Sequence, residues 1–560
     1  MRAIRTSVAI LAACVALAVG AHRAATDLSR GDEVRALYSD RFAFTDDGIP
    51  VVTVEIMGGQ DRVALRADGG LVALPSGDGG PSVAGADGWL IEAEGATPPR
   101  IREWTVVAEF DGADDAGAAR ELDRWRARGH ETRAFEVGTV FGVDGAVIDG
   151  RRRLVAIDPV PAGKGAKRAR RIARRYGVHT RVHEELVDPP RGTIVARAVG
   201  GRTVVRSPGV LWFAPARAGA TVEVADVVYG GGGSQVGAER TEDRSYYGSV
   251  YVTIGRDGKL VAVNAVPADK LLAGLVPAEI FPDAPDEALA AQAVAARTEL
   301  LSRIGTRHFA DPFLVCSSQH CQVYAGAGRE HPRTTRAVDR TRGLVLLRDG
   351  GGLVDARYSA SCGGHGEHNE HIWGGAPDPA LRGAVDATPA GASAMAPFAD
   401  GVSEAELDAF LALPDDAAYC GATRYGKGRF RWRVRLSADD LTARVAARYP
   451  GVGRVVALEP VDRGVSGRIR TLAIRGDRGT ATVTGDLAIR RLLGGLKSSL
   501  FRVTPEGPAA APAAFVIDGA GFGHGVGMCQ TGAIGRAEAG QTFRAILEHY
   551  YPGSRVRRLY

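Results

Sequence analysis

The stretch VPAEIFPDAPDEALAAQAVAARTELLSRIG, from Val276 to Gly305, decides the fold of the chain around it. Its second half predicts a helix that Asp283 caps, with Pro285 and Asp286 in the first turn and Gly305 just past the end. Apolar residues recur there at helical spacing, which predicts one packed face. That face comprises Leu289, Ala293, Ala296, Leu300 and Ile304. Because the face is mostly alanine, another backbone can approach it closely.

A single acid, Glu279, stands just before this helix. Its neighbours in sequence are all apolar: Val276, Pro277, Ala278, Ile280 and Phe281. In a site without water, desolvation disfavours the charged carboxylate and raises its pKa. Such a pKa suits a general acid, so Glu279 is the candidate catalytic residue. The alternative is a glutamate that points out of a hydrophobic turn into solvent.

Length and composition predict the fold class. A chain of 560 residues is expected to form two to four domains, and 45% hydrophobic residues are ample for folded cores. The 74 Gly and 28 Pro exceed the usual share and indicate many turns. We therefore expect an α+β fold, mostly β with a few core helices, in several domains. A net charge of +5 is small for this length and does not indicate a nucleic-acid-binding protein.

The first residues predict export. A basic segment, Met1–Arg5, precedes the apolar stretch Ser7–Ala21, and cleavage after Ala21 or Ala25 fits the small residues there. Residues 1–25 are therefore predicted to be a signal peptide, and the protein is expected in the cell envelope. The sequence LAAC also fits a lipoprotein box with Cys14 as the lipidated residue, although the apolar run continues past it. No other segment is predicted to contact the membrane.

Three segments precede the core. Residues 26–100 alternate apolar and polar side chains and predict an N-terminal β-rich domain. Residues 101–190 follow a βαββαβ order, with helices at 114–128 and 163–176, which predicts a ferredoxin-like domain. Residues 191–264 return to strands and form a β-rich lead-in that ends in a hairpin around Asp257.

The second helix of the ferredoxin-like segment is strongly basic. Its charged residues are Lys164, Lys167, Arg168, Arg170, Arg171, Arg174 and Arg175. They form either a solvated helix face or a surface for an anionic wall polymer. Nucleic acid is not an expected partner outside the cell.

Two motifs carry a family resemblance. VPAEIFPDAPDEALAAQAVAART resembles the signature of the stage II sporulation protein D family, which includes the amidase enhancers. Residues 521–540, GFGHGVGMCQTGAIGRAEAG, resemble the GHGVGM-x-Q-x-GA motif of that family, with Cys529 in place of the usual Ser. The resemblance covers roughly Gly248–Tyr560 and implies a catalytic core at residues 265–560. Residues 101–190 resemble the SPOR domain, which binds glycan strands without stem peptides, in element order and length alone.

The resemblance implies an activity and a set of site residues. Sporulation members of the family are lytic transglycosylases that cut peptidoglycan glycan strands, and Glu279 falls on their catalytic glutamate. Substrate-binding residues implied by the family motifs are Ser361 (or Ser359), Gly363, Gly364, His524 and Gln530. Trp373 would stack on a sugar ring, the alternative being a core tryptophan. The chain departs from the family at Lys270 and Glu299, where Tyr is common, and at Gly366, where Thr is common.

Cysteine and histidine residues predict a metal site after the helix. His308, Cys316, His320 and Cys321 are the ligand set of a tetrahedral structural zinc ion. Some members of the family carry zinc at this place. The alternative is a Cys316–Cys321 disulfide with two solvent-facing histidines.

The sequence contains two further groups of cysteine and histidine residues. Cys362 and Cys420 are expected to form a disulfide, which leaves Cys529 unpaired. His365, His368 and His371 recur every third residue, but a polar loop is favoured over a metal site there.

The presence of a single well-placed acid favours lytic transglycosylation over hydrolysis of the glycosidic bond. Glycoside hydrolases generally need two carboxylates, whereas a lytic transglycosylase needs only one, here Glu279. The predicted function is therefore cleavage of the MurNAc–GlcNAc bond of peptidoglycan glycan strands to 1,6-anhydro-MurNAc ends. The first alternative is a non-catalytic, glycan-binding enhancer of a partner cell-wall amidase. The second is a structural protein that anchors to the wall.

Overall fold

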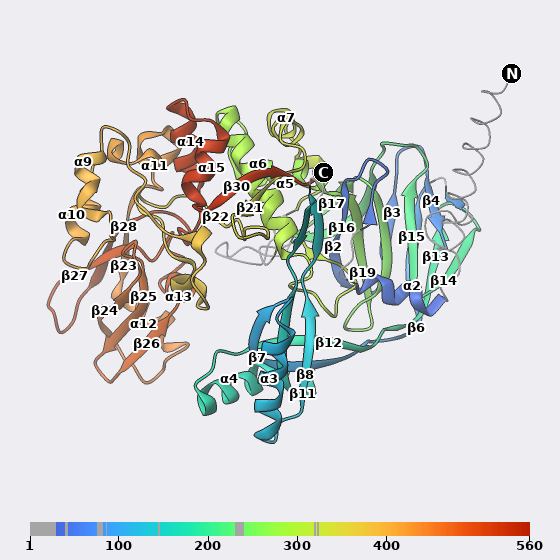
Figure 1. The fold of residues 1–560 in the computed structure, drawn as a ribbon, viewed down its shortest axis with the longest axis horizontal. Helices are drawn as coiled ribbons and strands as arrows, with labels where there is room; N and C mark the ends of the chain where they lie inside the picture. Colours follow the sequence, from blue (N-terminus) through green and yellow to red (C-terminus); the bar gives the residue numbers. More distant parts are fainter. Residues whose placement is uncertain are drawn as a thin grey trace.

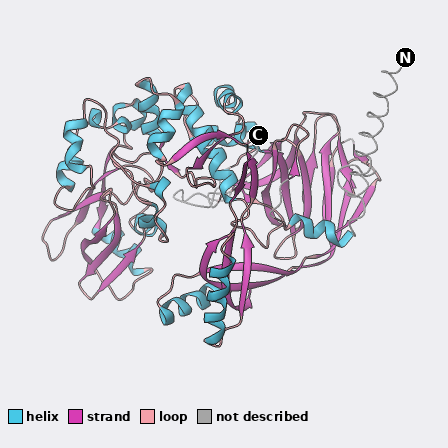
Figure 2. Ribbon diagram, in the orientation of Figure 1, coloured by secondary structure: helices cyan, strands magenta, loops and turns pink. Residues whose placement is uncertain are grey.

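The structure, a computed structural model, describes residues 30–39, 43–75, 82–85, 87–143, 146–229, 240–317, 321 and 324–560 (Figure 1). The predicted signal peptide, with Cys14, and His320 of the predicted zinc site lie outside the described residues. The largest group of strands lies on the right of the molecule, and most helices lie in its centre and upper left (Figure 2). The predicted α+β class, mostly β and multi-domain, is confirmed.

A β-unit of two sheets occupies one side of the molecule (Figure 1). The first sheet has the order β1 (Ala43–Phe44), β2 (Pro50–Gln60), β19 (Leu260–Pro267), β18 (Ser249–Ile254), β15 (Val210–Pro215), β4 (Leu71–Leu74) and β5 (Val83–Gly85). The short strand β20 (Val315–Cys316) pairs in parallel with β2. The second sheet has the order β14 (Val204–Pro208), β13 (Arg191–Ala198), β6 (Trp89–Thr97), β3 (Val63–Arg66), β16 (Val222–Tyr229) and β17 (Arg240–Tyr246).

The two segments expected to form separate β-rich domains share these sheets. Strand β2, from residues 26–100, pairs with β19, and β6 pairs with β13, from residues 191–264. The segments therefore fold as one β-unit with a common core, rather than as two domains. Local alternation of apolar residues predicts strands but carries no information on which distant strand becomes the partner.

The ferredoxin-like domain lies between β6 and β13 in the chain. Its sheet has the order β12 (Arg181–Asp188), β7 (Arg100–Asp111), β11 (Arg152–Pro161) and β8 (Thr132–Val137), and its helices are α3 (Asp115–Ala127) and α4 (Gly165–Tyr176). This order confirms the predicted βαββαβ unit. Asp114 caps α3 by accepting a hydrogen bond from the Gly117 N–H, and Trp125 of α3 is fully buried. A short hairpin, β9 (Val140–Val143) and β10 (Ala146–Asp149), extends the domain.

Two consecutive helices follow the β-unit, where one was predicted. Helix α5 (Ala268–Glu279) packs on β2 and β19, and α6 (Asp286–Arg303) follows it. Pro285, not Asp283, is the N-cap residue of α6, since Asp283 lies two positions earlier and pairs with Arg424 instead. Gly305 adopts φ +71° just past the helix end, as predicted. Helix α6 is buried on nearly every side, not on one face only.

The end of the chain returns to these helices. Strand β22 (Tyr358–Ser359) pairs in parallel with β29 (Met528–Cys529), which leads into α14 (Gln530–Glu538). Helix α15 (Phe543–Tyr550) follows, and β30 (Ser554–Arg558) pairs with β21 (Leu344–Arg348). Helices α14 and α15 both pack against α6. The C-terminal motif and the stretch around Glu279 therefore belong to one packed unit.

A further lobe lies within the predicted catalytic core. It contains β23 (Arg431–Ser437), β28 (Ala514–Ala520) and β27 (Phe501–Glu506) in one sheet, and β24 (Val455–Arg463), β25 (Ile469–Gly476) and β26 (Thr480–Thr484) in another. Helices α12 (Ala438–Ala446) and α13 (Asp486–Leu492) complete it. The lobe has its own hydrophobic core, which the sequence analysis did not separate from residues 265–560. In the part of the chain that the structure describes, we find no helix long and apolar enough to cross a bilayer.

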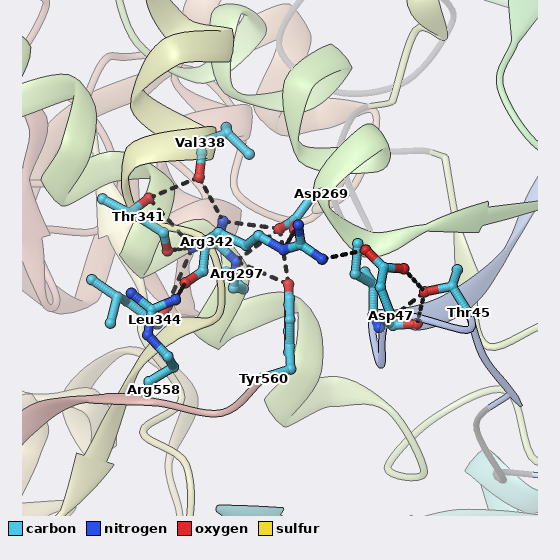
Figure 3. Close-up of polar contacts among 11 residues, drawn as sticks. Thr45, Asp47, Asp269, Arg297, Val338, Thr341, Arg342, Leu344, Arg558 and Tyr560 are labelled. Atoms are coloured by element: carbon cyan, nitrogen blue, oxygen red, sulfur yellow. Dashed lines mark hydrogen bonds and ion pairs between the residues drawn. The ribbon is translucent and has the colours of Figure 1, made fainter. Parts of the chain in front are cut away.

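A buried arginine fixes α5 against α6 (Figure 3). Arg297 of α6 is fully buried, and its guanidinium donates to Asp269 Oδ1 at 3.1 Å and to the Tyr560 hydroxyl at 3.2 Å. It also donates to the backbone carbonyls of Val338, Thr341 and Leu344. One side chain thus ties the start of α5, the end of α7 (Pro332–Arg340) and the last residue of the chain to α6.

Candidate active site around Glu279

Glu279 is the last residue of helix α5, not part of an irregular turn. Its side chain is half-buried and lies close to the charged groups of Glu299 and Arg303 on helix α6. Burial raises the pKa of Glu279 to about 7; the negative charge of Glu299 adds to this shift, and the positive charge of Arg303 opposes it. A carboxyl group with this pKa can both donate and accept a proton near neutral pH.

A second carboxylate lies beside Glu279 and was not predicted as part of the site. Glu299 is 5% exposed and forms an ion pair with Arg303, one turn further along α6. Arg303 also donates to the backbone carbonyl of Cys321. The signal in the sequence was the departure from the family at position 299, where an acid replaces the common Tyr. Its consequence for Glu279 became visible only in the packed structure.

Gln530 brings the C-terminal motif to Glu279. Its Nε2 donates to the backbone carbonyl of Glu279 at 2.7 Å and to Gln292 Oε1 of α6 at 3.2 Å. Gln530 is the first residue of α14 and is buried. The two family motifs therefore meet in the fold, and the contact between them is to the backbone of Glu279. Gln530 acts here as a positioning residue for the end of α5.

Tyr358 is a further member of the site that the sequence analysis missed. It is half-buried on β22, opposite Met528 of the C-terminal motif. Burial raises the pKa of Tyr358 well above its usual value, and the nearby charges of Glu279 and Glu299 add to the shift. The hydroxyl is therefore neutral at physiological pH and can donate a hydrogen bond next to the acid.

His524 and Trp373 lie together. Their ring centroids are 4.9 Å apart, and the guanidinium of Arg357 lies over the Trp373 ring at 4.8 Å. Trp373 is 47% exposed at the end of α8 (Asn369–Trp373), so it is not a core residue. Its exposed ring is available for stacking on a sugar.

The protonation state of His524 follows from its surroundings. Its Nδ1 accepts a hydrogen bond from the Val526 N–H at 3.0 Å. Burial lowers the pKa of His524 to about 3, and the positive charges of Arg357 and Arg468 add to the shift. The ring is therefore neutral, with its proton on Nε2, and can donate a hydrogen bond from that atom.

The other implied substrate-binding residues are buried. Ser361 is fully buried; its backbone N–H and carbonyl both bond to Phe522, and its hydroxyl has no partner among the described residues. Gly363 adopts φ +79°, and a Cβ there would lie 2.6 Å from the backbone nitrogen of Gly521. Gly364 packs against the rings of Phe410 and Phe430. These glycines let two segments of protein approach each other closely.

Three of the four predicted zinc ligands lie together. The ligand atoms of His308, Cys316 and Cys321 all lie within 4.8 Å of one another, and His308 Nε2 is 3.1 Å from Cys321 Sγ. The other ring nitrogen of His308 bonds to Asp311 at 2.8 Å. Histidines that bind zinc commonly donate their second ring N–H to a carboxylate in this way. Cys316 and Cys321 are not joined by a disulfide. The residues present fit a zinc ion.

The remaining cysteine and histidine predictions have different outcomes. The sulfur atoms of Cys362 and Cys420 are 3.7 Å apart, so the expected disulfide between them is absent. Within the described ranges, His365, His368 and His371 do not gather into a group of metal ligands. His365 is buried and His368 accepts a bond from the Gly383 N–H, so the segment is packed and ordered by internal contacts.

Comparisons with known proteins match two separate segments of the chain. A family profile described as Stage II sporulation protein matches residues 256–347, which contain α5, Glu279 and α6. A second profile, described as Domain of unknown function (DUF8618), matches residues 367–527, which contain the C-terminal lobe.

Individual relatives point to the same family. The chain is 29% identical over 300 residues to the Amidase enhancer of Bacillus subtilis, covering 50% of this chain and 40% of that protein. It is 26% identical over 306 residues to Stage II sporulation protein D of Bacillus amyloliquefaciens, covering 52% and 74%. An uncharacterized protein of Brachyspira hyodysenteriae is 29% identical over 313 residues, covering 55% and 71%. Residues 256–347 therefore belong to the Stage II sporulation protein family, and about half of the chain is similar to proteins named Stage II sporulation protein D and Amidase enhancer.

Proposed function

We propose that the protein is a lytic transglycosylase that cleaves peptidoglycan glycan strands, with Glu279 as acid and then base. The observation that carries the proposal is the half-buried Glu279 carboxyl, whose pKa is raised to about 7 beside the C-terminal motif. At neutral pH, a large fraction of such a group holds the proton that the first step needs.

The reaction needs no other carboxylate. Protonated Glu279 gives its proton to the glycosidic oxygen as the bond from that oxygen to carbon 1 breaks. The resulting carboxylate removes the proton from the hydroxyl on carbon 6 of the same sugar, and that oxygen bonds to carbon 1. The products are a 1,6-anhydro sugar and a free hydroxyl, and Glu279 is protonated again.

A hydrolytic outcome is less well supported by the site. An inverting hydrolase needs a second carboxylate that activates water, and a retaining one needs a carboxylate nucleophile at the sugar. The neighbouring Glu299 is buried and ion-paired with Arg303, so it is not free for either role. In this proposal, Tyr358 and His524 donate hydrogen bonds to the sugar, and Trp373 stacks on a ring.

The role of Glu299 gives a test in the pH profile. Glu299→Gln removes the negative charge that disfavours ionisation of Glu279, which lowers the pKa of Glu279. Because Glu279 must start protonated, activity should decline as pH rises through about 7, and in the variant this decline should occur at lower pH. The rate of anhydro-product formation, measured from pH 5 to 9, checks this. Glu459→Gln, at an exposed residue of β24, is the matched control and should keep the wild-type profile. A decline that stays in place or moves to higher pH would contradict the assignment.

The amidase-enhancer role is the second candidate, and the relative of that name favours it. In this case the same surface binds glycan strands and a partner amidase carries out the chemistry. Incubation of the pure protein with peptide-free glycan strands, followed by mass spectrometry, separates the two functions. Anhydro ends support the transglycosylase; their absence, together with stimulation of an added cell-wall amidase, supports the enhancer.

Both candidates require glycan binding through Trp373. Trp373→Ala should weaken binding of peptide-free glycan strands about five- to tenfold, as expected for loss of roughly 1 kcal/mol of stacking. Binding can be measured by calorimetry or by co-sedimentation with purified glycan. Val204→Ala, at a similarly exposed apolar residue of the β-unit, is the control and should bind as the wild type does. Equal affinity of the two variants would exclude Trp373 from the binding surface.

Further parts of the proposal concern the zinc ion and the N-terminal half. His308, Cys316 and Cys321, with His320, would hold a structural zinc ion that fixes the loop whose Cys321 carbonyl accepts from Arg303. The exposed basic face of α4 would bind anionic wall polymer or glycan, in the manner of a SPOR domain. Export to the cell envelope, by the predicted signal peptide or a lipid at Cys14, would bring the protein to this substrate.

A further inference from the structure

A second group of potential metal ligands lies apart from the one predicted at His308. Three thiols and one carboxylate, those of Cys362, Asp386, Cys420 and Cys529, each offer an atom within 4.8 Å of the other three. All four residues are buried. They come from four separate segments: the residues after β22, a loop, helix α11 (Tyr419–Ala422) and the end of β29.

The spacing of these atoms fits a shared ion rather than a covalent bond. The sulfurs of Cys362 and Cys420 are 3.7 Å apart, and Cys362 Sγ is 3.8 Å from Asp386 Oδ2. A disulfide would bring two sulfurs to about 2.05 Å. Tetrahedral zinc, with bonds of about 2.3 Å to sulfur and about 2.1 Å to oxygen, separates such ligand pairs by about 3.6 to 3.8 Å.

The surrounding groups hold the ligand atoms in place. Cys529 Sγ accepts hydrogen bonds from the backbone N–H groups of Cys362, at 3.1 Å, and Gly532, at 3.2 Å. It is also the N-cap of α14, where the helix dipole favours a negative charge. Such contacts favour the thiolate form, which is the form that binds metals.

The carboxylate is oriented in the same way. Asp386 Oδ1 accepts from Arg536 Nη2 at 2.7 Å, and its Oδ2, which faces Cys362, accepts from the Tyr550 hydroxyl at 2.9 Å. Outer contacts of this kind fix the ligands of protein metal sites. A small hollow lined by Cys362, Asp386, Gly527, His549 and Tyr550 adjoins the group.

We propose that Cys362, Asp386, Cys420 and Cys529 bind one tetrahedral zinc ion. Cysteine sulfur and carboxylate oxygen both bind zinc, and a closed, buried, four-coordinate arrangement rich in sulfur is typical of a structural zinc site. Asp386 and Cys420 belong to residues 367–527, which match the domain of unknown function, whereas Cys362 and Cys529 lie outside that segment. The ion would therefore connect this segment to the residues on either side of it. One of its ligands, Cys529, immediately precedes Gln530, which bonds to Glu279.

The test uses the full chain and separates this site from the one at His308. In a Cys316→Ser/Cys321→Ser background, elemental analysis should find one zinc ion per chain. X-ray absorption should show three sulfur neighbours at about 2.3 Å and one oxygen at about 2.0 to 2.2 Å. Adding Cys420→Ser to this background should remove the zinc, and adding Asp386→Asn should at least weaken its retention against a chelator. Adding Ser403→Ala, at an exposed hydroxyl, should leave one ion in place.

Several results would overturn the proposal. They are a background protein without zinc, a bound ion without sulfur neighbours, iron in place of zinc, or a Cys362–Cys420 disulfide in peptide mapping. Zinc retained unchanged in both the Cys420→Ser and the Asp386→Asn variants would also overturn it. If Cys420→Ser does not fold, the absorption measurement on the background protein still decides, because that protein keeps all four ligands. None of these readouts depends on transglycosylase activity.

Discussion

Glu279→Gln should abolish the formation of 1,6-anhydro ends, with a rate at least about 1,000-fold below that of the wild type. Glutamine keeps the size of the side chain but can neither protonate the glycosidic oxygen nor remove the proton from the hydroxyl on carbon 6. Both proton transfers are lost together. The measurement is mass spectrometry of peptide-free glycan strands after incubation with each pure protein. Glu459→Gln is again the control and should cleave at the wild-type rate. Comparable rates for Glu279→Gln and the wild type would remove Glu279 from the chemistry.

The same variant has a second, independent consequence for stability. The pKa of Glu279 is raised in the folded protein, from about 4.5 to about 7. Its contribution to stability is therefore fully present below about pH 4.5 and is lost as pH rises through about 7. Glutamine never ionises, so Glu279→Gln should be more stable than the wild type at pH 8, by up to about 3 kcal/mol. At pH 4.5 and below the two should be equally stable. Equal stability at both pH values would show that the carboxyl is well solvated.

Arg297→Ala should lower the free energy of unfolding of the core by about 3 to 5 kcal/mol. The substitution leaves the Asp269 carboxylate without its buried cation and leaves the carbonyls of Val338, Thr341 and Leu344 without their shared donor (Figure 3). Asp269 would keep the bond from the Tyr560 hydroxyl, and the Thr341 carbonyl would keep the bond from the Leu344 N–H, but each group would lose its charge-assisted bond to the guanidinium. Hydrogen exchange of the α6 amides in increasing denaturant localises the loss to this core in a chain of several domains.

Two further variants serve as controls for the effect of Arg297→Ala on stability. Arg433→Ala removes an exposed ion pair with Asp518 on the C-terminal lobe and should change stability by less than about 1 kcal/mol. Arg297→Lys keeps the charge near Asp269 but loses the forked donors, so it should fall between the alanine variant and the wild type. A loss below about 1 kcal/mol for Arg297→Ala would mean that the network does not hold α5 in place.

The position of Glu279 connects these two predictions. Arg297 fixes the first turn of α5 through Asp269, and Gln530 fixes the last residue of α5 through the Glu279 carbonyl. Helix α5, of twelve residues, is therefore held at both ends, and Glu279 lies at its C-terminal end. We infer that its placement depends on contacts from α6 and from the C-terminal motif, more than on α5 itself, which contains Pro277 in its last turn.

Local sequence patterns were enough to predict the elements that depend on local chemistry. The helical spacing of apolar residues and the glycine after them predicted the helix that ends before Gly305. Both signals are properties of residues close together in the chain. The βαββαβ order of residues 101–190 was predicted for the same reason. Glu279 was singled out by its apolar neighbours and by the family motif, and Gln530 by the motif alone.

Tertiary structure alone decided what depends on residues far apart in the chain. Strand β2 pairs with β19 across about two hundred residues, and no local pattern specifies such a partner. The charge of Glu299 beside Glu279, and the group of Cys362, Asp386, Cys420 and Cys529, exist only because packing brings separate segments together. The sequence alone determined which residue types could carry chemistry. The tertiary structure decided which of them share one desolvated site, since burial and proximity, which shift pKa values and form metal sites, are properties of the packed chain.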